Sequence, residues 1–203
     1  MMCFRIAGRC IADPPPTDWR DRLGARLGAK PRRIGTWAEL GLYGAMECLA
    51  DAGETTLSAQ ASLILSSQHG PVTGLRSAAE QASEDLPMPF TFLQTQPSQL
   101  LAMIAAQLSW RGDARFITHE DPQGLLRLAA VQGNQAGLLL GWVEEVGLGR
   151  SVWLRLKPDA GPAQKSKEVN SFWRDLAYAK HLFVFPEKIT VVLDLHGFAV
   201  RSA

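Results

Sequence analysis

His119, Glu120 and Asp121 are neighbours in one segment, and their types are the ones best suited to acid–base chemistry or metal binding. Imidazole and carboxylate groups are common metal ligands and proton carriers. Adjacent residues on one loop rarely converge on one ion, however, and no HExxH or HxH spacing accompanies them. Asp121 also precedes Pro122, which suits an N-cap followed by proline at the first helical position. We therefore interpret the cluster as a helix start and expect no metal site.

Ser66, Ser67 and His69 follow an apolar run and could supply a nucleophile and a base. A nucleophile elbow needs a GxSxG turn, which is absent here, and neighbours in sequence seldom adopt triad geometry. We therefore expect a polar turn at the end of a strand, at the edge of an α/β sheet where sites collect.

Three cysteines without a CxxC pair indicate neither a disulfide framework nor a zinc knuckle, so we expect small core residues and no cofactor. They are Cys3, Cys10 and Cys48.

Length and composition indicate one compact domain, because 203 residues with 46% hydrophobic content can bury a sizeable core. The formal net charge of +1 gives no field that favours nucleic acid or an anionic membrane. Apolar stretches such as residues 136–143 are far shorter than the roughly 20 residues that span a bilayer. Arg5 and Arg9 interrupt the first apolar run, which favours a strand over a secretory signal. We expect a cytoplasmic protein.

Hydrophobic periodicity and turn residues predict strands that alternate with helices. This alternation predicts an α/β fold with a mostly parallel mixed sheet that helices flank on both faces. Thr36 and Glu39 have the spacing of a capping box, and Ser98 suits an N-cap. The expected strands are 3–11, 61–65, 115–118, 136–146, 151–157 and 188–195; the expected helices are 36–52, 73–83, 98–109, 121–133 and 169–180; residues 86–92 are expected to be irregular.

A basic run lies between the first strand and the first predicted helix, and its glycines predict a surface loop. Such a run is most often a solvated face, but it could also meet an acidic partner. The candidate partner-binding residues are Arg20, Arg22, Arg26, Arg32 and Arg33.

Several segments together resemble the N-terminal half of the β-ketoacyl synthases, which have a thiolase-like fold. Residues 86–108 are similar to the family's proline-rich loop and the dimer-interface helix that follows it. Residues 112–118 resemble the short strand before the nucleophile, and Gly124-Leu125 the start of the next helix. Residues 136–145 resemble the following strand, with residues 141–145 at its acidic end. The resemblance implies a ketosynthase-like domain over 1–157, with 158–203 as an extension packed on the same domain.

The sequence departs from the family at its nucleophile, because Asp121 occupies the position of the active-site cysteine. A thiolate at a helix N-terminus accepts an acyl group, whereas a carboxylate there is a poor nucleophile toward a thioester. Chain-length-factor subunits resemble ketosynthases but lack the active-site cysteine, and they often carry glutamine at its position. In this chain Gln123 reaches that position only if the alignment is shifted by two residues. The family's two active-site histidines lie in a C-terminal half that this chain does not match.

The resemblance implies a non-catalytic partner or scaffold subunit in fatty-acid, polyketide or aryl polyene biosynthesis. The expected partner is a second copy or a ketosynthase-like subunit, with an acyl carrier protein as a further partner. Two alternatives stay open: an acyl-thioester-handling enzyme that uses Asp121, Glu120 or His119, and a solitary homodimeric acyl-binding protein. In the family the short strand and the helix before it lie at a two-fold interface, which on this chain corresponds to Leu101, Ile104, Leu108, Phe116 and Ile117.

Overall fold

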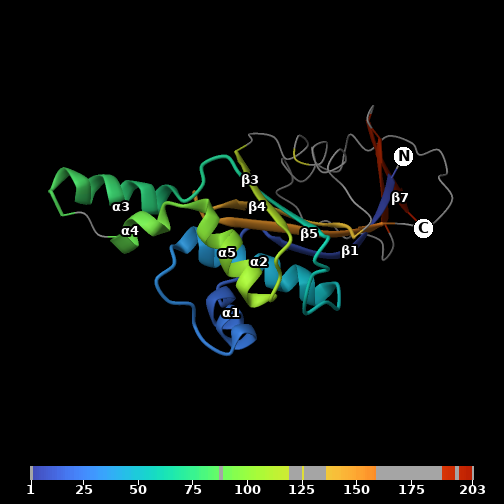
Figure 1. The fold of residues 1–203 in the computed structure, drawn as a ribbon, viewed down its shortest axis with the longest axis horizontal. Helices are drawn as coiled ribbons and strands as arrows, with labels where there is room; N and C mark the ends of the chain where they lie inside the picture. The colour runs from blue at the N-terminus through green and yellow to red at the C-terminus, as the bar shows by residue number, and fades with distance from the viewer. Residues whose placement is uncertain are drawn as a thin grey trace.

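The computed structural model describes residues 2–86, 89–118, 125, 136–158, 189–194 and 197–202. These residues form one seven-stranded sheet in the order β3-β2-β4-β5-β1-β6-β7 (Figure 1). The strands are β1 (Met2–Ala12), β2 (Ser62–Ser67), β3 (Asp113–Thr118), β4 (Leu138–Glu144), β5 (Arg150–Pro158), β6 (Ile189–Asp194) and β7 (Gly197–Ser202).

The sheet is mixed, and this confirms the predicted α/β class. Parallel pairing joins β2 to β3 and to β4, whereas every other described pairing is antiparallel. The sheet is therefore less parallel than the alternation of elements predicts. The reason is that β4 and β5 form a hairpin across a short turn, in which Gly147 and Gly149 have positive φ angles of 71° and 81°. The strand β7, which the sequence did not predict, pairs with β6, and β6 pairs with β1.

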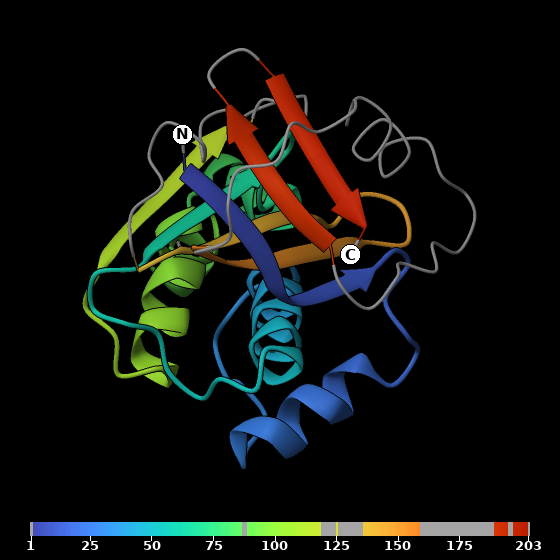
Figure 2. The same ribbon diagram turned by 90° about the vertical axis from the view of Figure 1, so that its right-hand side faces the viewer.

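Helices α2 and α5 cover one face of the sheet, and Figure 2 shows α2 lying beneath the strands with α1 below it. The side chain of Trp37, at the start of α2, donates to the carbonyl of Val143 at 3.0 Å and ties the helix to β4. Glycines on α2 allow close packing, because a Cβ at Gly44 would overlap Ser151 and Trp153 of β5. The helices are α1 (Trp19–Leu27), α2 (Thr36–Asp51), α3 (Val72–Ser83), α4 (Pro89–Gln94) and α5 (Pro97–Gln107).

Three local predictions need correction. The segment expected to be a basic loop contains α1, because Trp19 and Leu23 lie four residues apart and are buried together. The proline-rich segment contains α4, in which Pro89 occupies the first helical position, where its missing N–H costs nothing. The capping box does not form, since Gly35 is the N-cap of α2 and the Glu39 side chain pairs with Arg20 instead.

The core follows the alternation of the strands. On β2, Leu63 and Leu65 pack into the cluster under α2 and α5, whereas Ile64 faces the opposite cluster. The second cluster also contains Trp142 of β4 and Leu125. Both faces of the central strands are therefore buried, as a fold of this class requires. None of the helices in the described part of the chain is long and apolar enough to cross a membrane.

Candidate functional site

The expected position of the family nucleophile, with His119, Glu120, Asp121 and Gln123, lies outside the described residues. Its flanks are described. Thr118 ends β3 and pairs in register with Ser67 at the end of β2. Because β2 and β3 are parallel, their carboxyl ends meet at one edge of the sheet, beside the turn formed by residues 66–70. Thr118 therefore lies next to this turn.

Glu144, at the end of β4, organises the turn. Its Oε1 accepts a hydrogen bond from the Ser67 hydroxyl at 3.1 Å and another from the Gln68 amide. Its Oε2 accepts from the His69 amide at 3.3 Å and lies 3.2 Å from His69 Nδ1. The Gly70 amide in turn donates to Ser67 Oγ at 2.8 Å. One carboxylate thus satisfies several polar groups of a tight turn.

The serines of the turn are engaged in structural hydrogen bonds. Ser66 donates its hydroxyl to the carbonyl of Ile117 at 2.7 Å, and Ser67 donates to Glu144. A nucleophilic serine would instead donate to a histidine base. Both serine hydroxyls are therefore used to hold the polar turn at the end of β2 together. The role of Glu144 was not predicted, although an acidic residue at the end of a strand beside the turn is the sequence signal that could have indicated it.

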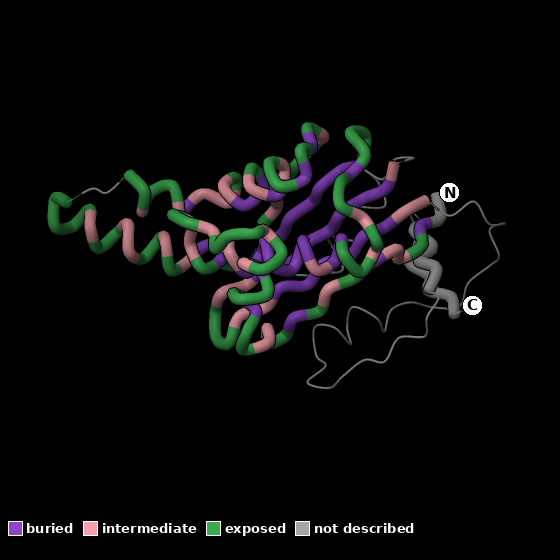
Figure 3. The backbone as a smooth tube through the Cα atoms, turned by 90° about the horizontal axis from the view of Figure 1, so that it is seen from below, coloured by how far each residue is buried: buried purple, intermediate pink, exposed green. Residues whose placement is uncertain are grey.

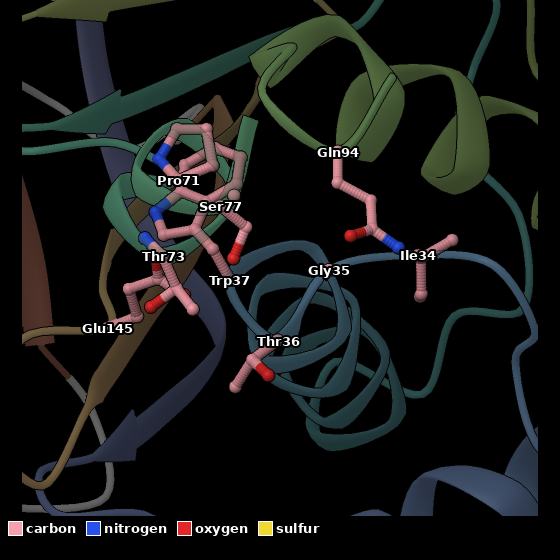
Figure 4. A pocket seen from close by; sticks show the side chains of 10 residues that line it. Ile34, Gly35, Thr36, Trp37, Pro71, Thr73, Ser77, Gln94 and Glu145 are labelled. Atoms are coloured by element: carbon pink, nitrogen blue, oxygen red, sulfur yellow. The ribbon is translucent and has the colours of Figure 1, made fainter. Parts of the chain in front are cut away.

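Glu145 continues the polar edge and caps the start of α3, where its Oε1 accepts from the Thr73 amide at 2.5 Å. A hollow of about 160 Å³ lies beside it, between the beginnings of α2 and α3 and the end of α4. Figure 4 shows Ser77 and Gln94 facing each other across the hollow, with Trp37 below. Ligand pockets usually have volumes of about 300–1,000 Å³, so this hollow is small for an acyl substrate.

The basic residues of α1 form ion pairs with carboxylates of this chain. Arg20 pairs with Glu39 at 2.9 Å and Arg26 pairs with Glu47 at 2.8 Å, so both link α1 to α2. Arg22 pairs with Asp18 at 2.9 Å, and the hydrogen bond from this arginine lowers the pKa of the Asp18 carboxyl.

The remaining two residues of the predicted basic surface lie in the loop after α1. Arg32 is exposed, and the Arg33 guanidinium lies 4.9 Å from the centre of the Phe90 ring. The predicted basic surface thus carries less uncompensated charge than its composition suggests, because ion pairs along α1 neutralise most of it.

The residues expected at an interface divide into two groups. Leu101, Ile104 and Leu108 of the α5 region are buried in the core of this chain, so they hold α5 in place and present no surface to a partner. Phe116 and Ile117 are half-buried on β3, which is one of the two edge strands of the described sheet. The Phe116 ring meets Trp37 edge-on, with the ring centres 6.0 Å apart. Of the residues expected at an interface, only Phe116 and Ile117 are therefore partly exposed.

An apolar surface that the sequence did not predict lies on α3 and α4. These helices and the turn after α3, residues 72–86 and 89–94, form an arm that projects from the sheet (Figures 1 and 3). Neither helix contains a buried residue. Most of the large apolar side chains that are exposed in the described residues lie on the arm: Leu75, Leu86, Phe90, Phe92 and Leu93.

The described cysteine thiols are poorly suited to nucleophilic chemistry. Burial, followed by the nearby Glu47 and Asp51 carboxylates, raises the pKa of Cys10 to about 12. Burial also raises the pKa of Cys48. Both groups stay protonated at neutral pH, whereas a reactive cysteine needs a lowered pKa. Within the described ranges, no three histidine, cysteine or acidic side chains gather in a way that could hold a metal ion.

Solved structures of similar fold come from ketosynthase complexes. No family model and no curated protein matches the sequence. A chain of the complex between the ketosynthase ApeO and its chain length factor ApeC from Xenorhabdus doucetiae matches with a TM-score of 0.52 and 13% identity, over 83% of this chain and 82% of that one.

Two further structures match with a TM-score of 0.55. One is the ishigamide ketosynthase/chain length factor, at 16% identity over 71% of this chain and 49% of that one. The other is AntDE:AntF, a type II acyl carrier protein in complex with its ketosynthase, at 13% identity over 78% and 63%. This chain thus spans about half to two thirds of the length of these two proteins. It has the α/β fold of the ketosynthase-like proteins, as the sequence resemblance predicts.

Proposed function

We propose that the chain is a non-catalytic, ketosynthase-like subunit that acts through a ketosynthase partner in fatty-acid, polyketide or aryl polyene biosynthesis. The observation that carries this proposal is the match with a chain of the ApeO–ApeC complex, which extends over more than four fifths of both chains. A subunit of comparable length therefore exists in a ketosynthase–chain length factor assembly.

The chemistry of the described residues supports a role without acyl transfer. The two described thiols have raised pKa values, and the serines of the turn donate their hydroxyls to Ile117 and Glu144. The carboxylate of Asp121, in place of the family cysteine, would yield a reactive anhydride rather than a stable thioester.

Co-expression with the ketosynthase encoded nearest to this chain tests the proposal. We expect the two proteins to copurify and condensation to require both. Replacing the active-site cysteine of the ketosynthase by alanine should abolish condensation, whereas Asp121→Ala in this chain should leave the rate unchanged. Incubation with an acyl-carrier thioester should leave this chain unlabelled.

Two results would contradict the proposal. A large loss of condensation in an intact complex that carries Asp121→Ala would favour the acyl-thioester-handling enzyme. A chain that forms a stable dimer by itself and ignores the ketosynthase would favour the solitary homodimer.

A further inference from the structure

One side of α3 carries an apolar stripe that the chain itself does not cover. Leu75, Ala79 and Ala82 are spaced four and three residues apart, so they lie along one side of α3, and Leu86 follows in the turn after the helix. All four are exposed, with Leu75 at 49% and Leu86 at 61%. We call this set the outer stripe: Leu75, Ala79, Ala82 and Leu86.

The opposite side of α3 packs on α4, so the outer stripe is not needed to hold the arm together. Gly74, Ser77 and Gln81 are half-buried on that side. The two helices approach closely at Gly74, where a Cβ would lie 2.8 Å from the carbonyl oxygen of Gln94. Phe92, 62% exposed on α4, adds to the apolar surface of the arm. Apolar surface gathered in this way is typical of a protein–protein contact.

The charges of the arm restrict which partner fits. Arg76 lies near the body, whereas three acids follow it toward the tip, so residues 72–94 have a formal charge of 1 − 3 = −2. The tip would repel an acidic protein and attract a surface with cations beside an apolar face. The small side chains of Ala79 and Ala82 allow a partner helix to approach closely. The three acids are Glu80, Glu84 and Asp85.

We propose that the outer stripe binds an apolar helix face of the ketosynthase-like subunit, with a cation of that subunit placed against the acidic tip. This inference rests on the proposed function and names the surface that serves it. A second copy of this chain fits less well, because its arm would bring three further carboxylates against one arginine. The matched ApeO–ApeC structure likewise pairs two different proteins.

Binding to the ketosynthase encoded nearest to this chain tests the surface, with the wild type and three single variants. Leu75→Asp and Ala82→Glu place a carboxylate in the outer stripe. Leu148→Asp is the matched control, because Leu148 is 82% exposed and lies on the β4–β5 turn, outside the arm. We expect the control to bind like the wild type, and both stripe variants to bind about tenfold more weakly or worse, as hot-spot substitutions do.

Two further measurements sharpen the result. Circular dichroism should show unchanged helix content in the stripe variants, because both positions are exposed in the free chain. Glu84→Lys should weaken binding at low salt, and the difference from wild type should shrink as salt rises, because the tip is exposed and therefore screened. If Glu84→Lys binds at low salt as tightly as the wild type, no cation of the partner lies against the acidic tip, and that part of the inference is wrong.

The possible failures are distinguishable. If the wild type binds the ketosynthase and both stripe variants bind equally tightly, the outer stripe is not the contact, while the proposed function stands. If the stripe variants only convert a dimer of this chain into a monomer, the occupant is a second copy and the inference is wrong. If the wild type binds no ketosynthase, the proposed function fails and the inference fails with it.

Discussion

Arg155 lies in the middle of β5 with only 2% of its surface exposed, and its guanidinium is paired with the carboxylate of Glu54. Its Nε donates to Glu54 at 2.6 Å, and one of its terminal nitrogens donates to the carbonyls of Leu138 and Leu156 at 3.3 and 3.0 Å. Lys157 also pairs with Glu54, at 2.8 Å. A buried charge persists only with such partners. This network joins the end of the α2 region to the start of β4.

The pKa of Glu54 leads to a prediction at this scale. Desolvation raises it, but hydrogen bonds from Arg155 and Lys157 outweigh burial, so the folded-state pKa lies below the ordinary value of 4.5. A carboxyl of this kind contributes stability above its unfolded-state pKa, and that contribution is lost as pH falls through the folded-state value. Urea unfolding between pH 6 and pH 3 should therefore show a shallower acid-induced loss of stability in Glu54→Gln than in the wild type. Parallel curves would exclude Glu54 as a contributor.

Helix ends show how element boundaries depend on single backbone conformations. At the end of α5, Ser109 has a φ of 49°, and the Trp110 amide donates to the Ala105 carbonyl at 2.9 Å. At the end of α2, Gly53 has a φ of 66°, and the Glu54 amide donates to the Leu49 carbonyl at 2.8 Å. Both ends have the hydrogen bond of a Schellman motif, but only α2 has the preferred glycine.

Ser109→Gly should therefore stabilise the protein by about 0.5–1 kcal/mol, because glycine adopts a positive φ without steric cost. The matched variant Gly53→Ala should destabilise it by a similar amount, since a Cβ there would meet nothing within 4 Å and only the backbone conformation is penalised. Urea unfolding of both variants measures the two effects. If Ser109→Gly is less stable than the wild type, the extra conformational entropy that glycine gives to the unfolded chain outweighs the relief of the positive φ in the folded chain.

At the scale of the whole molecule, the described sheet ends at β3, which has β2 on one side only. An edge strand leaves backbone amides and carbonyls available for pairing with another chain. The strand is short and carries exposed Asp113 and Arg115, which pair with each other at 2.9 Å. These charges help to prevent indiscriminate pairing, while Phe116 and Ile117 remain half-buried.

Hydrogen exchange tests whether this edge takes part in assembly. In the isolated chain, the β3 amides that face away from β2 should exchange rapidly. In the complex with the ketosynthase they should become protected, because a pairing strand would accept their hydrogen bonds. Amides of β4 should change little, since both neighbouring strands already pair with β4. Unchanged exchange along β3 would place the contact elsewhere, for example on the arm alone.

The sequence by itself determined the elements with strong local patterns. The apolar runs of β2, β4 and β5, the apolar periodicity of α5, and the glycine turn between β4 and β5 all give signals within a few residues of one another. The same local order also carried the resemblance to the ketosynthase fold. Helix α1 escaped prediction because its stability depends on packing against α2 and on ion pairs with Glu39 and Glu47, about twenty residues away.

Only the tertiary structure decided which apolar faces are covered. Leu100 and Ile104 of α5 have the same four-residue spacing as Leu75 and Ala79 of α3, yet the first pair is buried and the second is exposed. Arg155 likewise alternates with apolar neighbours like a solvent-facing strand residue, but Glu54 covers it. Periodicity reports that one side of an element is apolar or polar. What lies against that side depends on residues far away in the sequence, and only the folded chain brings them together.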